Sequence, residues 1–296
     1  MNEANDTTAH KGPAADLKNS AIKILPLSPG IGAEIVGVDL SRELDAGTFE
    51  RIRQAWYDYN ILLFRGQRLA EEDQVRFAGR FGELAKLVNK NDGMTGHPAV
   101  MLVSNVKKDG KLIGALPDGE MYFHSDQCYV ERPCAATMLY SIEIPSRGGN
   151  TLFANMYKAY DTLPEDMKRR ISGRKAMNVY DYDRSATARP QGEIRTDAPS
   201  YAHPIVRTHP VTGRKALYVN RLMTQYILDI PRAESDEILK FLFDHQEQPQ
   251  FVYEHVWTPG ELIIWDNRCS LHARSDFDAG ERRMLRRVII LGEKPF

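Results

Sequence analysis

The residue types that could do chemistry begin with a histidine and an aspartate two positions apart. His124 and Asp126 lie in the apolar and aromatic stretch FHSDQCY, residues 123–129, and His272 follows 148 residues after His124. Two histidines and one carboxylate can form a facial triad that leaves three metal positions open, the arrangement expected of a non-haem iron(II) oxygenase. A chain with 8 histidines and 40 acidic residues produces an H-x-D by chance, so the combination of all three residues carries the hypothesis.

Two arginines follow the second histidine on a strand-like segment. Arg283 and Arg287 are four positions apart, an even number, so on a strand both side chains point to one face. Burying a guanidinium on an apolar face costs free energy unless an anion pairs with it. One of these two arginines would therefore hold a dicarboxylate co-substrate. Arg274, Arg282 and Arg286 are expected to be solvated or paired surface charges, because Arg282 and Arg286 fall on the opposite face.

The elements that must position these residues are mostly strands. Residues 1–20 are small, polar and aperiodic and are predicted to be a disordered leader before a single domain at 21–296. Helical periodicity predicts helices at 45–59, 70–84, 156–171 and 234–246. Strands are predicted at 60–67, 99–106, 136–144, 150–156, 216–220, 251–257, 261–267 and 286–292. This pattern is typical of an antiparallel β-sandwich or jelly roll that carries helices, an α+β arrangement.

Composition excludes several classes of function. The net charge is −1, which gives no electrostatic reason to expect a nucleic-acid or membrane partner. The three cysteines form no C-x-x-C pair, no apolar run is long enough to cross a bilayer, and no glycine-rich nucleotide-binding loop follows a strand. We expect a cytoplasmic protein.

Several longer segments carry a family resemblance. They are GAEIVGVDLS, LLFRGQ, RFGEL, FHSD, PSRGGNTLF, HPVTGRKALYVN, WDNR and RRVIILGEKPF. With them the sequence resembles the TauD/TfdA group of Fe(II)- and 2-oxoglutarate-dependent dioxygenases over nearly everything beyond the leader. The resemblance implies a double-stranded β-helix (jelly roll) core with flanking helices. It also implies hydroxylation of a substrate C–H by O2, coupled to decarboxylation of 2-oxoglutarate to succinate and CO2.

The resemblance also implies roles for individual residues. The two histidines and Asp126 match the iron ligands. Arg283, assisted by Thr151, matches the partner of the distal carboxylate of 2-oxoglutarate, and Arg287 matches the arginine that grips an anionic group of the primary substrate. We further expect a homo-oligomer, either a dimer or a tetramer.

The substrate implied by this pattern is a small organic anion, such as a phenoxyalkanoate or an alkanesulfonate. The segment after FGEL offers Leu87 and Lys90 where taurine dioxygenase has a histidine and a tyrosine, which argues against taurine. Candidate residues of the substrate-pocket wall are Glu120, Met121, Tyr122, Asn220 and Met223.

Other interpretations stay open at this point. A non-catalytic jelly roll that binds a metal or ligand is the alternative from another class, although it has no need of an open-sided metal site. A halogenase on the same scaffold would lack the carboxylate ligand, so Asp126 predicts hydroxylation. The histidines with an expected structural role are His97, His203, His209, His245 and His255.

Overall fold

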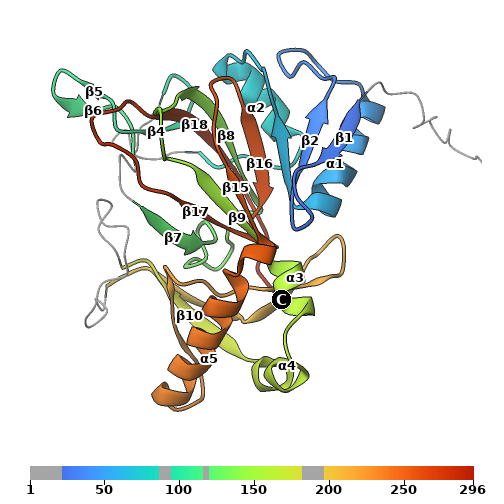
Figure 1. The fold of residues 1–296 in the computed structure, drawn as a ribbon, viewed down its shortest axis with the longest axis vertical. Helices are drawn as coiled ribbons and strands as arrows, with labels where there is room; N and C mark the ends of the chain where they lie inside the picture. Colours follow the sequence, from blue (N-terminus) through green and yellow to red (C-terminus); the bar gives the residue numbers. More distant parts are fainter. Residues whose placement is uncertain (1–21, 87–94, 116–119, 182–196) are drawn as a thin grey trace, which may run out of the picture.

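The computed structural model describes residues 22–86, 95–115, 120–181 and 197–296, and the predicted leader lies outside them. Two main sheets lie against each other (Figure 1). The larger sheet has the order β1-β2-β3-β16-β8-β18-β4, and the smaller has the order β15-β9-β17-β7. From β7 to β9 and from β15 to β18, consecutive strands alternate between the two sheets. The predicted jelly-roll core with flanking helices is confirmed.

The strands of the larger sheet are β1 (Lys23–Pro26), β2 (Ala33–Val36), β3 (Ile61–Phe64), β16 (Leu262–Asp266), β8 (Ala136–Glu143), β18 (Met284–Ile290) and β4 (Met101–Ser104). Those of the smaller sheet are β15 (Val252–His255), β9 (Thr151–Asn155), β17 (Ser270–Arg274) and β7 (Met121–His124). Short additional strands are β5 (Lys107–Lys108), β6 (Lys111–Leu112), β10 (Lys175–Val179), β11 (Ser200–Pro204), β12 (Val206–Thr208), β13 (Lys215–Leu217) and β14 (Thr224–Ile227).

Strand alternation gives the larger sheet two buried faces. Leu63, Ile263 and Leu285 point inward and pack with Phe153 of the smaller sheet. The residues that alternate with them along each strand, such as Ile264, point outward. They belong to a separate hydrophobic core beneath the first two helices. The inner face of the larger sheet is therefore the wall against which a site between the sheets is built.

Two helices cover the outer face of the larger sheet, α1 (Ala46–Tyr59) and α2 (Glu71–Gly79) (Figure 1). Asp45 caps α1 by accepting a hydrogen bond from the backbone N–H of Thr48 at 2.9 Å. The helix predicted at 45–59 is confirmed, and its apolar side chains Phe49, Ile52 and Trp56 are buried on the sheet.

The remaining helices pack around a second core on the other side of the smaller sheet. They are α3 (Met156–Asp161), α4 (Glu165–Ile171) and α5 (Arg232–Gln246), with a 3-10 turn at Pro249–Phe251. The prediction of a single helix at 156–171 is wrong. Pro164 disfavours helical backbone at the residue before it, so the segment forms two short helices instead of one. No helix within the described ranges is long and apolar enough to span a membrane.

Candidate active site

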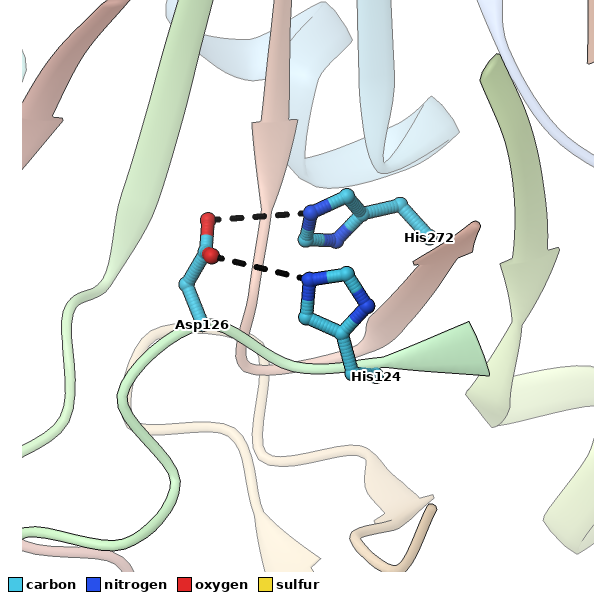
Figure 2. Close-up of side chains that lie close together, drawn as sticks. All are labelled: His124, Asp126 and His272. Carbon is cyan, nitrogen blue, oxygen red and sulfur yellow. Dashed lines mark ion pairs between the residues drawn. The ribbon is translucent and has the colours of Figure 1, made fainter. Parts of the chain in front are cut away.

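The predicted metal-ligand residues meet where β7 pairs with β17. His124 is the last residue of β7, and the antiparallel register sets it opposite His272 in β17. Asp126 follows β7, and its two carboxylate oxygens lie 3.8 Å from Nε2 of His124 and 3.8 Å from Nε2 of His272. Figure 2 shows this carboxylate facing both imidazole rings. The ligand atoms of the three buried side chains all lie within 4.8 Å of one another.

The protonation states of these side chains suit a metal. Nδ1 of His124 lies 2.9 Å from the carbonyl oxygen of Tyr122, and because a carbonyl only accepts, Nδ1 carries the proton and Nε2 keeps its lone pair. Burial lowers the pKa of His124 and that of His272, which favours neutral imidazoles. Burial alone would raise the pKa of Asp126, but the guanidinium of Arg287 holds the pKa of that carboxyl well below its usual value.

The surroundings of the triad orient its carboxylate. Thr137 Oγ1 donates to one oxygen of Asp126 at 2.6 Å, and Arg287 Nη2 lies 2.6 Å from the other. Such outer partners fix the orientation of metal-binding carboxylates. Nδ1 of His272 is buried without a hydrogen-bond partner in the described residues, so no contact there fixes the tautomer of this ring. Two neutral imidazoles and one ionised carboxylate form the donor set used by non-haem iron(II), and the residues present fit that ion.

A cavity of about 470 Å³, part of it open to solvent, adjoins the triad between the two sheets. Its apolar wall comes from Val103, Met121, Leu139, Trp265 and Ala273, and its polar wall from the triad, Thr151, Arg274, Arg283 and Arg287. The described residues therefore give this apolar cavity three guanidiniums and one carboxylate in its wall.

Arg283 and Arg287 both reach this cavity, as their even spacing predicts. Arg283 immediately precedes β18 and is buried, with Nε and Nη2 donating to the carbonyl oxygen of Gly149 at 3.2 and 3.1 Å. Burial, together with the charge of Arg274, lowers the pKa of Arg283 to about 9. An arginine is intrinsically so basic that it stays charged near pH 7, so Arg283 presents a poorly solvated cation to the cavity.

Two expectations about surface arginines are wrong. Arg274 is buried and lines the cavity, because it lies two positions after His272 on β17 and therefore shares its face. Arg286 faces outward as expected but is buried under α2, where it donates to the carbonyl oxygen of Leu69 and lies over the ring of Tyr140. Arg282 is exposed and pairs with Glu143, so that expectation is confirmed.

Three predicted wall residues do not line this cavity. Tyr122 is 37% exposed and lines a different surface hollow. The register of β7 against β17 shifts between His124 and residue 121, and this irregularity turns Met121 into the cavity instead. Asn220 and Met223 are buried beside Cys128, where the Asn220 side chain donates to the thiol and accepts from the backbone N–H of Met223. Leu87 and Lys90 lie outside the described residues.

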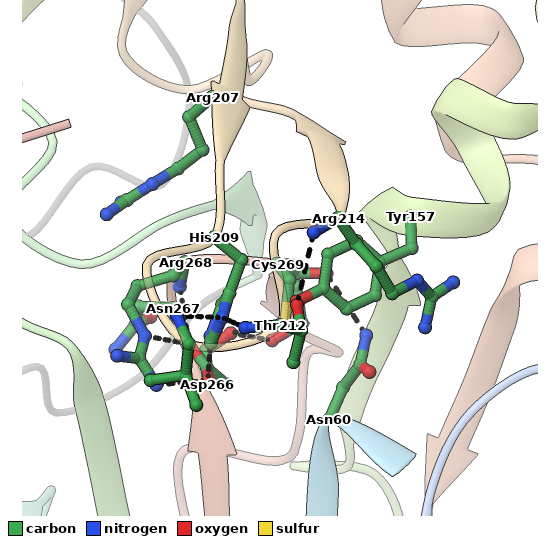
Figure 3. Close-up of polar contacts among 12 residues, drawn as sticks. Asn60, Tyr157, Arg207, His209, Thr212, Arg214, Asp266, Asn267, Arg268 and Cys269 are labelled. Atoms are coloured by element: carbon green, nitrogen blue, oxygen red, sulfur yellow. Dashed lines mark hydrogen bonds and ion pairs between the residues drawn. The ribbon is translucent and has the colours of Figure 1, made fainter. Parts of the chain in front are cut away.

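A second cluster of possible metal ligands, His209, Asp266 and Cys269, is already occupied by protein groups (Figure 3). Arg268 donates to both oxygens of Asp266, and His209 Nε2 lies 3.0 Å from one of them. Nδ1 of His209 accepts from two backbone N–H groups of the following turn, so Nε2 carries the proton. This network fixes the turn before His272 and gives His209 the structural role expected of it.

Comparison with known proteins identifies the group. A model of the taurine catabolism dioxygenase TauD, TfdA family matches residues 23–289. The chain belongs to the TauD/TfdA family. Pentalenolactone F synthase of Streptomyces avermitilis is 33% identical over 282 residues, covering 90% of this chain and 92% of the relative. The (S)-phenoxypropionate/alpha-ketoglutarate-dioxygenase of Sphingobium herbicidovorans is 34% identical over 289 residues, covering 92% and 96%.

A similar solved structure supports the same conclusion. The crystal structure of AAD-2 in complex with Mn(II) and N-oxalylglycine has a TM-score of 0.78 and 29% identity, covering 93% of this chain and 98% of that chain. This TauD/TfdA protein is thus an iron(II)- and 2-oxoglutarate-dependent dioxygenase that uses O2. When bound, the iron supplies the oxidising chemistry, and the protein positions the reactants and shields them from water.

Proposed function

We propose that His124, Asp126 and His272 hold the iron and that Arg283 and Thr151 bind the distal carboxylate of 2-oxoglutarate. The closeness of the three ligand atoms and the favoured neutral form of both imidazoles support the first assignment. The buried guanidinium of Arg283 at the cavity wall supports the second, because an anion there would stabilise a charge that burial destabilises.

The primary substrate is a small organic anion, and the observation that carries this proposal is Arg287. Its guanidinium reaches the cavity beside the triad, where one of its nitrogens contacts Asp126. A guanidinium has five N–H donors, so this contact leaves donors for a carboxylate or sulfonate. Iron(II) and the 2-oxoglutarate dianion cancel each other in charge, and Arg283 and Arg287 then place two positive charges beside Asp126, the one carboxylate that the described residues contribute to the wall.

The rest of the substrate is apolar. Val103, Met121 and Leu139 face the cavity with apolar side chains that donate no hydrogen bond. An aryl or alkyl group carrying one acidic group would match both walls. An aryloxyalkanoate, the class in the name of the Sphingobium relative, has this form.

A panel of matched acids and neutral analogues tests the proposal. Phenoxyalkanoates, alkanesulfonates, sulfate esters and taurine are each supplied with iron(II), ascorbate and 2-oxoglutarate, and succinate and oxidised product are measured. Each carboxylic acid is compared with its primary amide in the native enzyme and in Arg287→Gln. We expect kcat/KM to favour the acid in the native enzyme by about 30-fold or more, because a desolvated charge pair contributes roughly 2 to 5 kcal/mol. Equal turnover of acid and amide by both proteins would contradict the anion proposal.

Assembly and location remain predictions. We expect a dimer or tetramer, which sedimentation velocity of the purified protein would resolve from a monomer of 33.6 kDa. A cytoplasmic location is supported by the cysteines, since all three are free and buried.

A further inference from the structure

Thr151 makes a hydrogen bond that constrains its hydroxyl proton. It begins β9, is buried and lines the cavity, and β17 sets it directly opposite Arg274. Its Oγ1 accepts a hydrogen bond from Nε1 of Trp257 at 2.9 Å. Trp257 is buried and follows β15 by two residues.

The chemistry of the two groups fixes the direction of this bond. An indole nitrogen is a donor only, whereas a hydroxyl has one proton and two lone pairs. Thr151 must therefore accept from Trp257, and its own proton must go to another group. Within the described parts of the chain, Thr151 Oγ1 donates to no acceptor. A carboxylate that enters the cavity beside Arg283 would supply the missing acceptor.

Trp257 is held firmly enough to act in this way. Its ring meets the ring of His255 edge-on, with centroids 4.7 Å apart. His255 Nε2 lies 2.9 Å from the buried carboxylate of Glu261, which also accepts from the backbone N–H of Thr258 at 2.8 Å and pairs with Arg65. The indole N–H therefore has a fixed direction before any ligand arrives.

We propose that Trp257 is a positioning residue for the co-substrate: its N–H holds the Thr151 hydroxyl with the proton directed at the distal carboxylate of 2-oxoglutarate. This inference rests on the proposed roles of Arg283 and Thr151. Trp257 itself touches no reacting atom in this arrangement. It acts by removing the alternative directions of the Thr151 proton and by polarising that hydroxyl as a donor.

The test compares two oxo acids in the same protein. 2-Oxopentanoate is 2-oxoglutarate with the distal carboxylate replaced by a methyl group, so it chelates iron but lacks the group that Thr151 would bind. Both acids are titrated anaerobically into the iron(II)-loaded protein, and their dissociation constants are read from the visible charge-transfer band. The proteins are the native enzyme, Trp257→Phe, Thr151→Val and the double variant. Should Trp257→Phe fail to fold, benzothienylalanine at position 257 keeps the bicyclic shape without the N–H.

We expect Trp257→Phe to raise the dissociation constant of 2-oxoglutarate about 3- to 10-fold, the effect of one neutral hydrogen bond of about 1 kcal/mol. The constant for 2-oxopentanoate should stay unchanged, and adding Trp257→Phe to Thr151→Val should have no further effect. Equal weakening of both acids would mean general damage to the site and would overturn the inference. The inference would also be overturned if Thr151→Val weakened 2-oxoglutarate binding and Trp257→Phe left it unchanged. If Thr151→Val itself leaves 2-oxoglutarate binding intact, the assignment of Thr151 fails and the inference falls with it.

Discussion

Replacing Arg283 by glutamine is expected to weaken co-substrate binding while making the fold more stable. In the free protein the charge of Arg283 is costly, because burial and the charge of Arg274 lower its pKa from 12.5 to about 9. At about 1.4 kcal/mol per pKa unit, this shift corresponds to roughly 5 kcal/mol at most. The substitution gives up two hydrogen bonds to Gly149, each contributing about 1 kcal/mol. The free energy of unfolding should therefore rise by up to about 3 kcal/mol.

Binding should move in the opposite direction. A charge pair with a carboxylate in a desolvated site contributes roughly 2 to 5 kcal/mol, so the dissociation constant of 2-oxoglutarate should rise by about 30-fold or more. Anaerobic titration of the charge-transfer band measures binding, and urea unfolding without 2-oxoglutarate measures stability. Arg282→Gln is the matched control, because Arg282 is the adjacent arginine but is exposed and paired with Glu143 outside the cavity.

Two results would refute this reasoning. Binding of 2-oxoglutarate to Arg283→Gln within 3-fold of the native value would remove Arg283 from the co-substrate site. A variant several kcal/mol less stable than the native protein would show that the buried charge is well compensated in the absence of ligand.

Three further predictions concern other parts of the site and its support. Arg274→Gln removes one positive charge from the cavity wall and should weaken 2-oxoglutarate binding about ten-fold. Calorimetry that finds no change in binding would exclude Arg274 from anion recognition. Burial lowers the pKa of His203 to about 4, below the usual 6.5, so the unfolded chain binds more protons between these values. Stability should therefore fall by up to about 3 kcal/mol as the pH drops from 6.5 to 4, and His203→Gln should lessen that slope in urea unfolding. Arg268→Leu leaves Asp266 without its main charge partner and should cost about 3 to 5 kcal/mol by the same assay, whereas a cost below 1 kcal/mol would contradict the role of this pair.

The candidate site could largely be predicted from the sequence because its chemistry depends on residue type and spacing. An even separation on a strand was enough to set Arg283 and Arg287 on one face, and the same argument applied to His272 would have identified Arg274 as a cavity residue. Burial depends on what packs above a strand, which the strand's own sequence does not contain.

The predictions that failed depended on local irregularity or on distant partners. Strict alternation along β7 would place the side chain of Tyr122 on the same face as that of His124. The register shift between β7 and β17 places the side chain of Met121 on that face instead. The hydrogen bond between Trp257 and Thr151 joins residues 106 positions apart. No local pattern predicts such a contact, because the pairing of β15 with β9 creates it.

The measurement that tests the central claim most directly is the consumption of 2-oxoglutarate by the purified protein with and without its proposed metal ligands. Iron(II)-loaded native protein should give a charge-transfer band with 2-oxoglutarate under anaerobic conditions and form succinate when air and a substrate from the panel are added. Removing the metal with a chelator should abolish both signals, and Asp126→Ala and His272→Ala should each lose turnover while remaining folded by circular dichroism. Full succinate formation by either variant, or the absence of a band in the native protein at saturating iron and 2-oxoglutarate, would contradict the account.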